Sequence, residues 1–400
     1  SQLRYMRYGR VVDTTRMRTE FGFEPSYTTD EAMHAYLVDS GTEPLITRAS
    51  LESKAGRIAA LLPQEQAPPV SRALEGTLVP AFLDLQVNGG GGVLVSGSTD
   101  VADLERLCAA HRALGSAGVL PTLITDTAEA TAGVIAAGLK AARAGVPGFL
   151  GLHLEGPHLD PRRKGAHDPA LIRPMEEADL DRLCRAARDL PALMVTLAPE
   201  AATAQQIHAL SQAGAVVSLG HSDCSYETAM AAFRAGARCA THLFNAMSQL
   251  GHRSPGLVGA VLTGTCAAGL IADGVHVHPA AMSLALAARP EGIFLVTDCM
   301  AFAGTDLTEM TLHGRQVLRQ DGRLTLADGT LAGADLTLPD AVARLVGTLG
   351  VPIERALRMA SAIPAALIGR SADYGAIRPG TRAEMLLLDD DLHLKECLGF

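Results

Sequence analysis

The chain has 400 residues, of which 48% are hydrophobic, 4% aromatic and 19% charged, and its formal net charge is −9. This length exceeds one ordinary hydrophobic core but suits a barrel domain of roughly 250 residues beside a small second domain, and the apolar content excludes a disordered chain. The acidic balance excludes the broad basic surface of a nucleic-acid-binding protein, and no apolar run reaches the roughly 18 residues of a membrane helix.

The N-terminal segment gives the weakest structural signals. It opens with "SQLRYMRYGR", which lacks the apolar core of a secretion signal, so we expect a cytoplasmic protein. The first 45 residues show no clean strand alternation, and their conformation is left open. Near the other end, "GAIRPGTRAEMLLLDDDLHL" is typical of a turn followed by a strand. We expect residues 1–79 and 373–400 to build a small β-sandwich domain together, and residues 80–372 to form the main domain.

From Val79 onward, short apolar runs alternate with longer helical patterns. Patterns such as "DVADLERLCAAHRALGSAG" and "SYETAMAAFRAGA" carry apolar residues three and four positions apart, as amphipathic helices do. The eight apolar runs are "AFLDLQVNG", "GVLPTLIT", "GFLGLHLEGP", "ALMVTLAPE", "AVVSLGHS", "ARCATHLFNAM", "AGLIADGVHV" and "IFLVTDCM". Eight strands with intervening helices predict a (β/α)8 barrel of the TIM type.

Ligand-type side chains stand at the ends of three of these runs. Glu155 ends "LGLHLE", His221 lies in "SLGHSD" and His242 lies in "ATHLFNAM". The carboxyl ends of barrel strands meet at one face, and neighbouring strands lie about 4.8 Å apart, so these side chains can converge on one ion. Two His and one carboxylate leave a position for water, which is typical of catalytic zinc. Taken singly, each has a plainer interpretation, as a solvated carboxylate or a packed histidine.

Two further residues suit proton transfer and charge stabilisation. Asp298 ends the eighth run, where a carboxylate can take a proton from water and pass it to a leaving nitrogen. The alternative for Asp298 is a residue that caps the next turn. His167, in "KGAHDP", follows Glu155 in the same loop and can donate a hydrogen bond to a carbonyl oxygen that becomes negative.

A site for a small anion is indicated after the sixth and seventh runs. Asn245 and Arg253 lie in "NAMSQLGHRSPG", and His276 lies in "ADGVHVH". Together they suit a phosphate monoester, because Arg offers a forked set of donors and His a second donor. An isolated loop arginine would instead be solvated, so the prediction depends on the neighbours of Arg253.

A set of linked motifs between Val79 and Asp389 resembles one known family. In chain order the motifs are "LDLQVNGGGG", "LHLEGPHLDPRRKGAH", "GHSDCSYE", "ATHLFNAM", "RSPGLVGA", "IADGVHVH", "VTDCMAFAG", "GTLAGADLTL" and "GAIRPGTRAEMLLLD". They resemble the N-acetylglucosamine-6-phosphate deacetylases of the amidohydrolase superfamily. The resemblance implies a hydrolase that removes acetate from the 2-acetamido group of this sugar phosphate, in the catabolism and recycling of amino sugars.

The resemblance also implies roles for individual residues. It assigns one divalent metal ion to Glu155, His221 and His242. It assigns proton transfer to Asp298, with His167 polarising the amide carbonyl. Binding of the sugar phosphate falls to a larger set, namely the Ala166 backbone, Asn245, Ala246, Arg253, Asp273, Gly274, Val275, His276, Leu331, Ala332 and Gly333. His276 would reach the phosphate in the neighbouring subunit's site, which implies a homodimer.

The metal site departs from the wider superfamily on the first strand. Many amidohydrolases have His-x-His there, which serves a second metal, but this chain has Gln86-Val87-Asn88. Amides are weak ligands, so we expect one tightly held ion, zinc first, with iron, cobalt and manganese as alternatives. Cys299 beside Asp298 offers an accidental metal contact or an oxidation site. The seven cysteines never form C-x-x-C, which predicts reduced thiols.

Three alternative functions stay open. The epimer N-acetylgalactosamine 6-phosphate would use the same residues. Another amidohydrolase reaction, such as the opening of a cyclic amide, would use the same metal but would need neither Arg253 nor His276. A non-catalytic barrel that binds a metal or a sugar would keep the ligands without turnover, and the presence of Asp298 argues against it.

Overall fold

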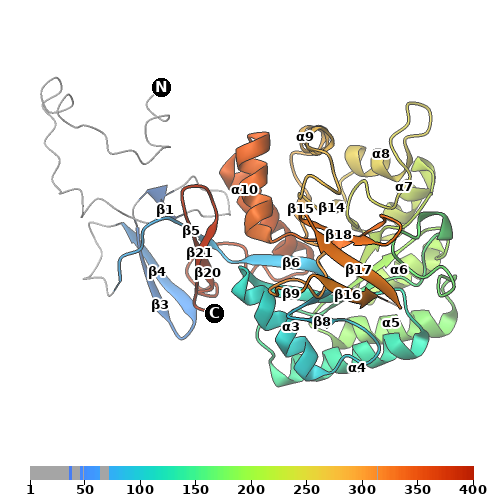
Figure 1. Cartoon of the computed structure of the whole chain (residues 1–400), viewed down its shortest axis with the longest axis horizontal. Helices are drawn as coiled ribbons and strands as arrows, with labels where there is room; N and C mark the ends of the chain where they lie inside the picture. Colours follow the sequence, from blue (N-terminus) through green and yellow to red (C-terminus); the bar gives the residue numbers. More distant parts are fainter. Residues whose placement is uncertain (1–35, 38–45, 48, 64–71, 313) are drawn as a thin grey trace, which may run out of the picture.

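The computed structural model describes residues 36–37, 46–47, 49–63, 72–312 and 314–400. Its centre is an eight-stranded sheet of parallel strands that follow one another in chain order (Figure 1). The strands are β6 (Phe82–Val87), β9 (Ser116–Ile124), β10 (Leu152–Glu155), β11 (Leu193–Leu197), β12 (Val216–Leu219), β13 (Cys239–Ala240), β14 (Ala267–Leu270) and β15 (Ile293–Leu295). All eight predicted runs contain a strand, and the predicted (β/α)8 barrel is confirmed.

Contacts between the first and last strands close this sheet into a barrel. A parallel bridge joins Val87 to Cys299, and the Asn88 N–H donates to the Cys299 carbonyl oxygen at 2.8 Å. The buried Asp84 carboxylate accepts from the Thr297 N–H at 3.2 Å and from the Thr297 hydroxyl at 2.6 Å. Because β6 and β15 share no longer ladder in the described chain, these contacts hold the seam.

Helices surround the barrel (Figure 1). They are α3 (Val101–Ala113), α4 (Ala128–Ala144), α5 (Glu177–Asp189), α6 (Ala204–Gln212), α7 (Tyr226–Ala235), α8 (Gly256–Thr263), α9 (Pro279–Ala288), α10 (Leu338–Leu349), α11 (Ile353–Ala360) and α12 (Ala362–Leu367). Local chemistry fixes where they begin: the Asp100 side chain accepts from the Asp103 N–H at the start of α3, and Ser225 accepts from the Thr228 N–H at the start of α7. Both helical patterns chosen from the sequence therefore form helices.

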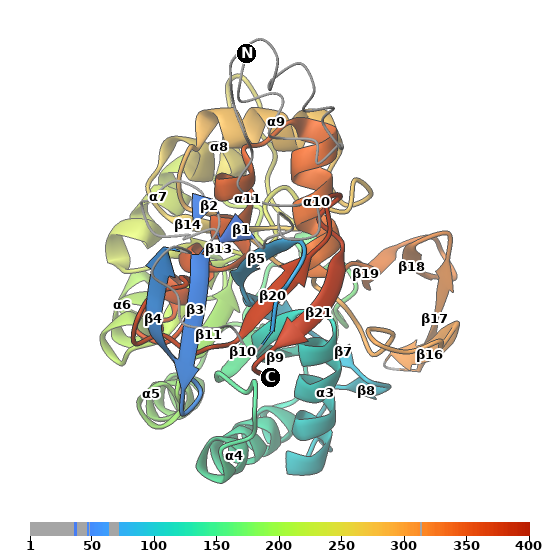
Figure 2. The same cartoon turned by 90° about the vertical axis from the view of Figure 1, so that its left-hand side faces the viewer.

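Strands from both ends of the described chain pair beside the barrel (Figures 1 and 2). A five-stranded sheet has the order β2 (Ile46–Thr47), β1 (Tyr36–Leu37), β5 (Thr77–Pro80), β20 (Met385–Leu388), β21 (Leu394–Leu398). The hairpin of β3 (Ala49–Lys54) and β4 (Arg57–Pro63) packs on it through a core that includes Ile58, Leu78 and Met385. The small β-sandwich from both chain ends is thus confirmed. We propose 79/80 and 372/373 as the domain boundaries; residues 1–35 and 38–45 lie outside the described residues.

A four-stranded antiparallel sheet, which the sequence did not lead us to predict, is inserted between β15 and α10. Its strands are β16 (Glu309–Leu312), β17 (Arg315–Gln320), β18 (Arg323–Leu326) and β19 (Leu331–Ala334), and we call them the inserted sheet. Its apolar side chains, Leu312 and Val317 among them, pack against Met300 and Phe302. The inserted sheet lies next to the short hairpin of β7 (Gly89–Gly90) and β8 (Val93–Leu94) in Figure 2.

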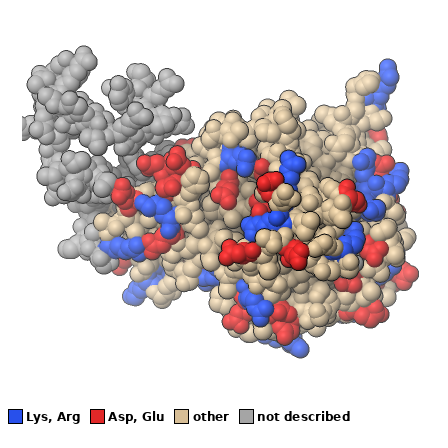
Figure 3. Space-filling model, in the orientation of Figure 1, with Lys and Arg blue, Asp and Glu red and all other residues tan. Residues whose placement is uncertain are grey.

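Charged side chains of both signs are interspersed over the face shown in Figure 3. The coloured part of that face carries no broad basic patch, in agreement with the net charge of −9. In the part of the chain that the structure describes, no helix has both the length and the apolar character needed to cross a membrane.

Candidate active site

Sharp backbone turns place three of the predicted residues at the barrel mouth. His221 and His242 follow β12 and β13 by two residues, and Asp298 follows β15 by three. Their φ angles are positive, at 47°, 29° and 52°. This left-handed region costs a non-glycine residue roughly 1–2 kcal/mol, so such turns persist only where surrounding contacts fix them. Each turn ends its strand abruptly, and all three side chains border the same cavity.

Three ligand-type atoms meet in this mouth. His221 Nε2 lies 3.0 Å from Glu155 Oε1, and His242 Nε2 lies 3.1 Å from the same oxygen. The two Nε2 atoms lie 3.0 Å apart. His221 Nδ1 donates its hydrogen to the Arg163 carbonyl oxygen at 2.8 Å, so a neutral His221 turns the lone pair of Nε2 toward the carboxylate.

This arrangement fits a divalent cation. Lone pairs that face one another repel unless a proton or a cation lies between them, and the three side chains offer ligand atoms that all lie within 4.8 Å of one another. Burial alone would raise the pKa of Glu155, but the two imidazoles hold it well below its ordinary value. Burial lowers the pKa of His242, yet the contact with Glu155 raises it overall. A His2Glu set in which a backbone carbonyl orients one imidazole is the usual construction of such a site.

Two amide side chains hold Asp298. Asn88 Nδ2 donates to Asp298 Oδ1 at 2.7 Å, and Gln86 Nε2 donates to the same oxygen at 3.2 Å. Gln86 Nε2 also lies 3.2 Å from Glu155 Oε2, so one amide joins the ligand set to the candidate base. Burial and the charge of Glu155 raise the pKa of Asp298 to about 6, although His242 and Asn88 act in the opposite direction. Both amides engage Oδ1, which makes Oδ2 the oxygen suited to proton transfer.

The loop after β10 brings His167 to the ligand set. The Thr125 N–H donates to His167 Nδ1 at 3.2 Å, and the Thr125 hydroxyl lies 2.7 Å from the same nitrogen. A ring nitrogen that accepts from a backbone N–H carries no hydrogen, so a neutral His167 bears its hydrogen on Nε2. The ring centroids of His167 and His221 lie 4.3 Å apart. His167 is therefore held as a hydrogen-bond donor beside the ligands.

A buried chain of polar side chains supports the site from inside the barrel. His153 Nδ1 donates to the Leu85 carbonyl oxygen at 3.1 Å, so Nε2 accepts from the Thr196 hydroxyl at 2.7 Å. Thr196 then accepts from Thr241 at 2.6 Å, and Thr241 accepts from Ser218 at 2.6 Å. Burial lowers the pKa of His153 to about 4, and a neutral ring satisfies every one of these contacts. His153 belongs to the barrel core and is not a ligand in this arrangement.

The three ligand-type residues, His167 and Asp298 all border one cavity of about 240 Å³. Of the residues predicted to bind substrate, those that border it are Ala166, Asn245, Ala246, His276, Leu331, Ala332 and Gly333. Arg253, Asp273, Gly274 and Val275 do not border it. Arg253 is exposed on the turn after β13. Asp273 contacts His276 instead: its Oδ2 accepts from His276 Nδ1 at 2.6 Å, which orients the histidine.

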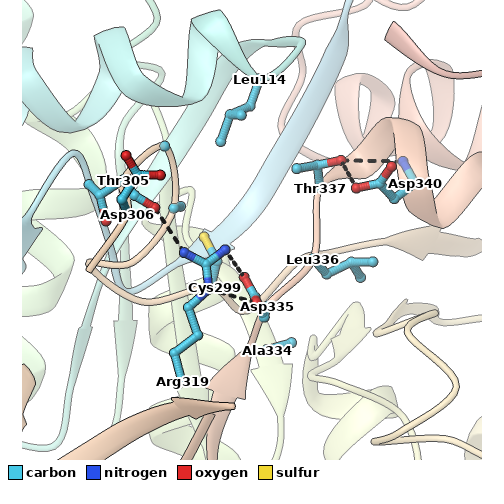
Figure 4. A pocket seen from close by; sticks show the side chains of 12 residues that line it. Leu114, Cys299, Thr305, Asp306, Arg319, Ala334, Asp335, Leu336, Thr337 and Asp340 are labelled. Carbon is cyan, nitrogen blue, oxygen red and sulfur yellow. Dashed lines mark hydrogen bonds and ion pairs between the residues drawn. The ribbon is translucent and has the colours of Figure 1, made fainter. Parts of the chain in front are cut away.

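Cys299 borders a second, larger cavity of about 520 Å³ (Figure 4). Figure 4 shows Arg319 against Asp335, with Nε 2.8 Å from Oδ2, while Arg319 Nη1 donates to the Thr305 carbonyl oxygen at 2.8 Å. These contacts tie β17 to the segments that precede and follow the inserted sheet. We place the active site in the smaller cavity, because the ligand set and Asp298 border it and do not border the larger one. Burial raises the pKa of the Cys299 thiol well above its ordinary value.

Sequence reasoning missed the apolar and hydroxyl residues that complete the smaller cavity, which are Ile124, Ile271, Met300, Leu312 and Thr330. An available signal for the inserted sheet was the pair of dipeptides Asp321-Gly322 and Asp328-Gly329 between short apolar runs, a mark of hairpin turns. The apolar cavity residues carry no comparable mark, because their side chains are those of any protein core.

Known proteins resemble this chain over most of its length. A family model described as the amidohydrolase family matches residues 77–397. The chain belongs to the amidohydrolase family. This amidohydrolase is a hydrolase of carbon–nitrogen bonds, and the divalent metal that the superfamily uses agrees with its Glu155, His221 and His242 cluster.

Individual relatives of this amidohydrolase include two kinds of deacetylase. The N-acetylgalactosamine-6-phosphate deacetylase of Shewanella sp. (strain ANA-3) is 40% identical over 325 residues, which are 81% of this chain and 82% of the relative. The N-acetylglucosamine-6-phosphate deacetylase of Bos taurus is 37% identical over 331 residues, 80% and 81% of the two chains. A crystal structure of N-acetylglucosamine-6-phosphate deacetylase from Pasteurella multocida superposes with a TM-score of 0.85 at 32% identity, covering 90% of this chain and 95% of that one.

Proposed function

We propose that this amidohydrolase hydrolyses the acetamido group of N-acetyl-D-glucosamine 6-phosphate to D-glucosamine 6-phosphate and acetate. The observation that carries the proposal is the meeting of Glu155, His221 and His242 in one cavity with Asp298, whose Oδ1 two amides hold. A divalent cation bound to Glu155, His221 and His242 would supply a water of lowered pKa and a Lewis acid for the carbonyl. We propose zinc for this ion, with iron, cobalt and manganese as alternatives that the same ligands accept.

Asp298 moves the proton in this reaction. Through Oδ2 it accepts a proton from the attacking water, whose oxygen becomes the second oxygen of acetate. As the C–N bond breaks, Asp298 returns that proton to the sugar nitrogen, which leaves as the amine. His167 Nε2–H donates to the carbonyl oxygen while negative charge develops on it. Gln86 and Asn88 keep Asp298 oriented through both steps.

Binding of the phosphate, which lies away from the reacting amide, positions the carbonyl. We assign it to Arg253 and His276, with Asn245, Ala246 and the Ala166 backbone contacting the sugar phosphate. The segment Asp273, Gly274 and Val275 and the loop Leu331, Ala332 and Gly333 complete the proposed contacts. Binding energy from a group that does not react can be used to orient the group that does. His276 supports this assignment by its place at the cavity and its orientation by Asp273.

N-acetylgalactosamine 6-phosphate is the second candidate substrate. The relatives from Shewanella and Escherichia coli O157:H7, each 40% identical to this chain, are both N-acetylgalactosamine-6-phosphate deacetylases. The two sugars differ only in the configuration of one hydroxyl, so the same ligand set and the same base serve both.

We also propose a homodimer in which phosphate-binding residues cross the subunit boundary. The resemblance assigns this crossing to His276, but His276 borders the cavity of its own chain, so we place Arg253 across the boundary. Arg253 supports a shared site, because it is exposed and lies outside the cavity of its own chain. Leu250, three residues earlier in the same turn, is 59% exposed. Large exposed apolar side chains next to a functional loop favour contact with another subunit.

The test is acetate release from each of the two sugar phosphates by purified protein, before and after chelation and with metal added back. We expect release that is lost on chelation and restored by zinc, and a kcat/KM for N-acetylglucosamine at least tenfold below that for its 6-phosphate, since a charged contact is worth about 1.5–3 kcal/mol. A faster reaction on the galactosamine substrate would favour the second candidate. No release from folded, metal-loaded protein on either substrate would overturn the proposed function.

A further inference from the structure

One wall of the active-site cavity is apolar and is built from separate elements. Ile124, Ala166, Met300, Leu312 and Ala332 all border the cavity. Met300, Leu312 and Ala332 belong to one hydrophobic cluster, and Ile124 and Ala166 pack against it. Met300, Leu312 and Ala332 are no more than 3% exposed. We call these five residues the apolar wall. The side chains of this wall favour an apolar group and penalise a hydroxyl or phosphate that would lose its water there, whereas we assign the sugar-phosphate contacts of Ala166 and Ala332 to their backbone groups.

The apolar wall begins one strand away from the ligand set. In the ladder between β9 and β10, Ile124 is the Cα partner of Glu155. Paired residues of neighbouring strands project to the same side of a sheet at a spacing of about 4.8 Å, so the Ile124 side chain lies beside the carboxylate. On the other side of the mouth, Met300 follows Asp298 by two residues. A carbonyl group held between Glu155 and Asp298 is therefore within reach of the wall.

We propose that the apolar wall binds the acyl substituent of the scissile amide and limits the length of the acyl chain that this enzyme removes. The inference rests on the proposed function. In an N-acetylated sugar phosphate the acetyl methyl is the one group without a polar atom of its own, whereas the ring carries hydroxyls and the phosphate is charged. The wall and the methyl are thus matched in polarity, and both adjoin the reacting carbonyl.

The inserted sheet sets the position of the limiting residue. Leu312 ends β16 and is the Cα partner of Arg315 across the hairpin. The Arg315 guanidinium donates to the Ala166 carbonyl oxygen, which links β17 to the loop that carries His167. The Arg319–Asp335 ion pair joins β17 to the residue that follows β19. Leu312 is therefore placed against the cavity by a strand pair that has its own contact with the loop after β10, and a limit on chain length requires a fixed position of this kind.

The experiment compares acyl-chain preferences in matched variants. Leu312→Ala and Ile124→Ala enlarge the cavity at the apolar wall, and Ile124→Val removes a single methylene from the wall. Leu324→Ala is the control, because Leu324 lies fully buried in the same cluster but does not border the cavity. For each protein, kcat/KM is measured on N-acetyl-, N-propanoyl- and N-butanoyl-glucosamine 6-phosphate. The ratio of two substrates on one sample is unaffected by the fraction of protein that is folded.

We expect Leu312→Ala and Ile124→Ala to raise the propanoyl-to-acetyl ratio at least about tenfold, the lower end for one methylene in an apolar pocket, with a smaller rise for Ile124→Val. Leu324→Ala should leave the ratio at the wild-type value. Equal loss on all three substrates would assign the wall to the sugar ring and overturn the inference, as would an equal rise in Leu324→Ala. If wild-type protein released no acetate at all, the proposed function itself would fail, which is a distinct result.

Discussion

Asp298 occupies a backbone position that asparagine also tolerates. Its φ of 52° lies in the left-handed region, where Asn is enriched among non-glycine residues. Asp298→Asn should therefore fold normally while it loses the group that accepts the proton, and we expect kcat to fall at least about 100-fold with bound metal unchanged. Initial rates and elemental analysis of the same sample check this. Turnover near the wild-type value would show that another group is the base.

Asn88 gives a second test at the same scale, because its amide donates to Asp298 Oδ1 at 2.7 Å. Asn88→Ala should lower kcat by about 10–100-fold with little change in KM, as is usual for a residue that orients a catalytic group. Asn88→Asp places a negative charge beside Asp298 and raises its pKa further. The fraction of ionised base at neutral pH then falls, so the acidic limb of the profile of kcat/KM against pH should move to higher pH.

For comparison, Asn245→Ala, in a residue assigned to substrate, should mainly raise KM. An Asn88→Ala variant that changed KM alone would place Asn88 with the substrate contacts and not with the base.

The roles of single residues could be predicted from the sequence where the side chain is of a type that commonly binds metals or transfers protons. Glu155, His221 and His242 stood at strand ends, and barrel topology alone brings such ends together. Gln86 and Asn88 were interpreted only as missing histidines, because an amide fits many environments and its role depends on distances that a sequence does not contain. The same holds for Thr125, which fixes the tautomer of His167.

Among the elements, the seam between β6 and β15 contains one buried carboxyl, that of Asp84. Burial raises the pKa of Asp84 to about 7 from 3.8, against the hydrogen bonds from Thr297 and Gln86. A carboxyl whose pKa is higher in the folded state favours folding while it is protonated. That contribution is complete below about pH 4 and is lost as the pH rises through about 7.

Asp84→Asn copies the neutral carboxyl: its amide nitrogen can donate to the Thr297 hydroxyl while its oxygen accepts from the Thr297 N–H. The variant should therefore gain stability relative to wild type as the pH rises from 5 to 8, by about 3 kcal/mol at most. Urea unfolding of both metal-free proteins at several pH values measures the difference. If the free energy of unfolding changed with pH in the same way for both proteins, Asp84 would not titrate in this range.

Whether an element could be predicted depended on how clearly its burial shows in the pattern of apolar residues. Barrel strands are buried on both faces and appear as apolar runs, so all eight were predicted. The inserted sheet has one exposed face: β17 alternates buried Val317 with exposed Gln316 and Leu318, and charged residues interrupt its pattern. Its hairpin turns were the better signal, and they say nothing about where the sheet packs.

For the whole molecule, the proposed homodimer predicts that two impaired variants restore one another at substrate concentrations well below KM: Asp298→Asn lacks the base, and Arg253→Ala binds the sugar phosphate weakly. In a dimer with shared sites, a chain with Arg253→Ala keeps its own Asp298 and receives Arg253 from a partner that carries Asp298→Asn. Random mixing of the two variants under conditions that exchange subunits should therefore recover about a quarter of wild-type activity, since half of the dimers are mixed and each has one complete site. If mixed dimers were demonstrated and no activity was recovered, Arg253 would belong to the site of its own chain.

The inserted sheet leaves the barrel and returns to it at one place. A backbone bridge joins Cys299 to Ala334, and the Ala334 N–H donates to the Asp298 carbonyl oxygen at 3.0 Å. A segment whose two ends meet can be lengthened, shortened or replaced while the rest of the chain keeps its path. Descendants of one ancestral gene could thus exchange this segment as a cassette and acquire new acyl preferences, while inheriting the ligand set and the base unaltered.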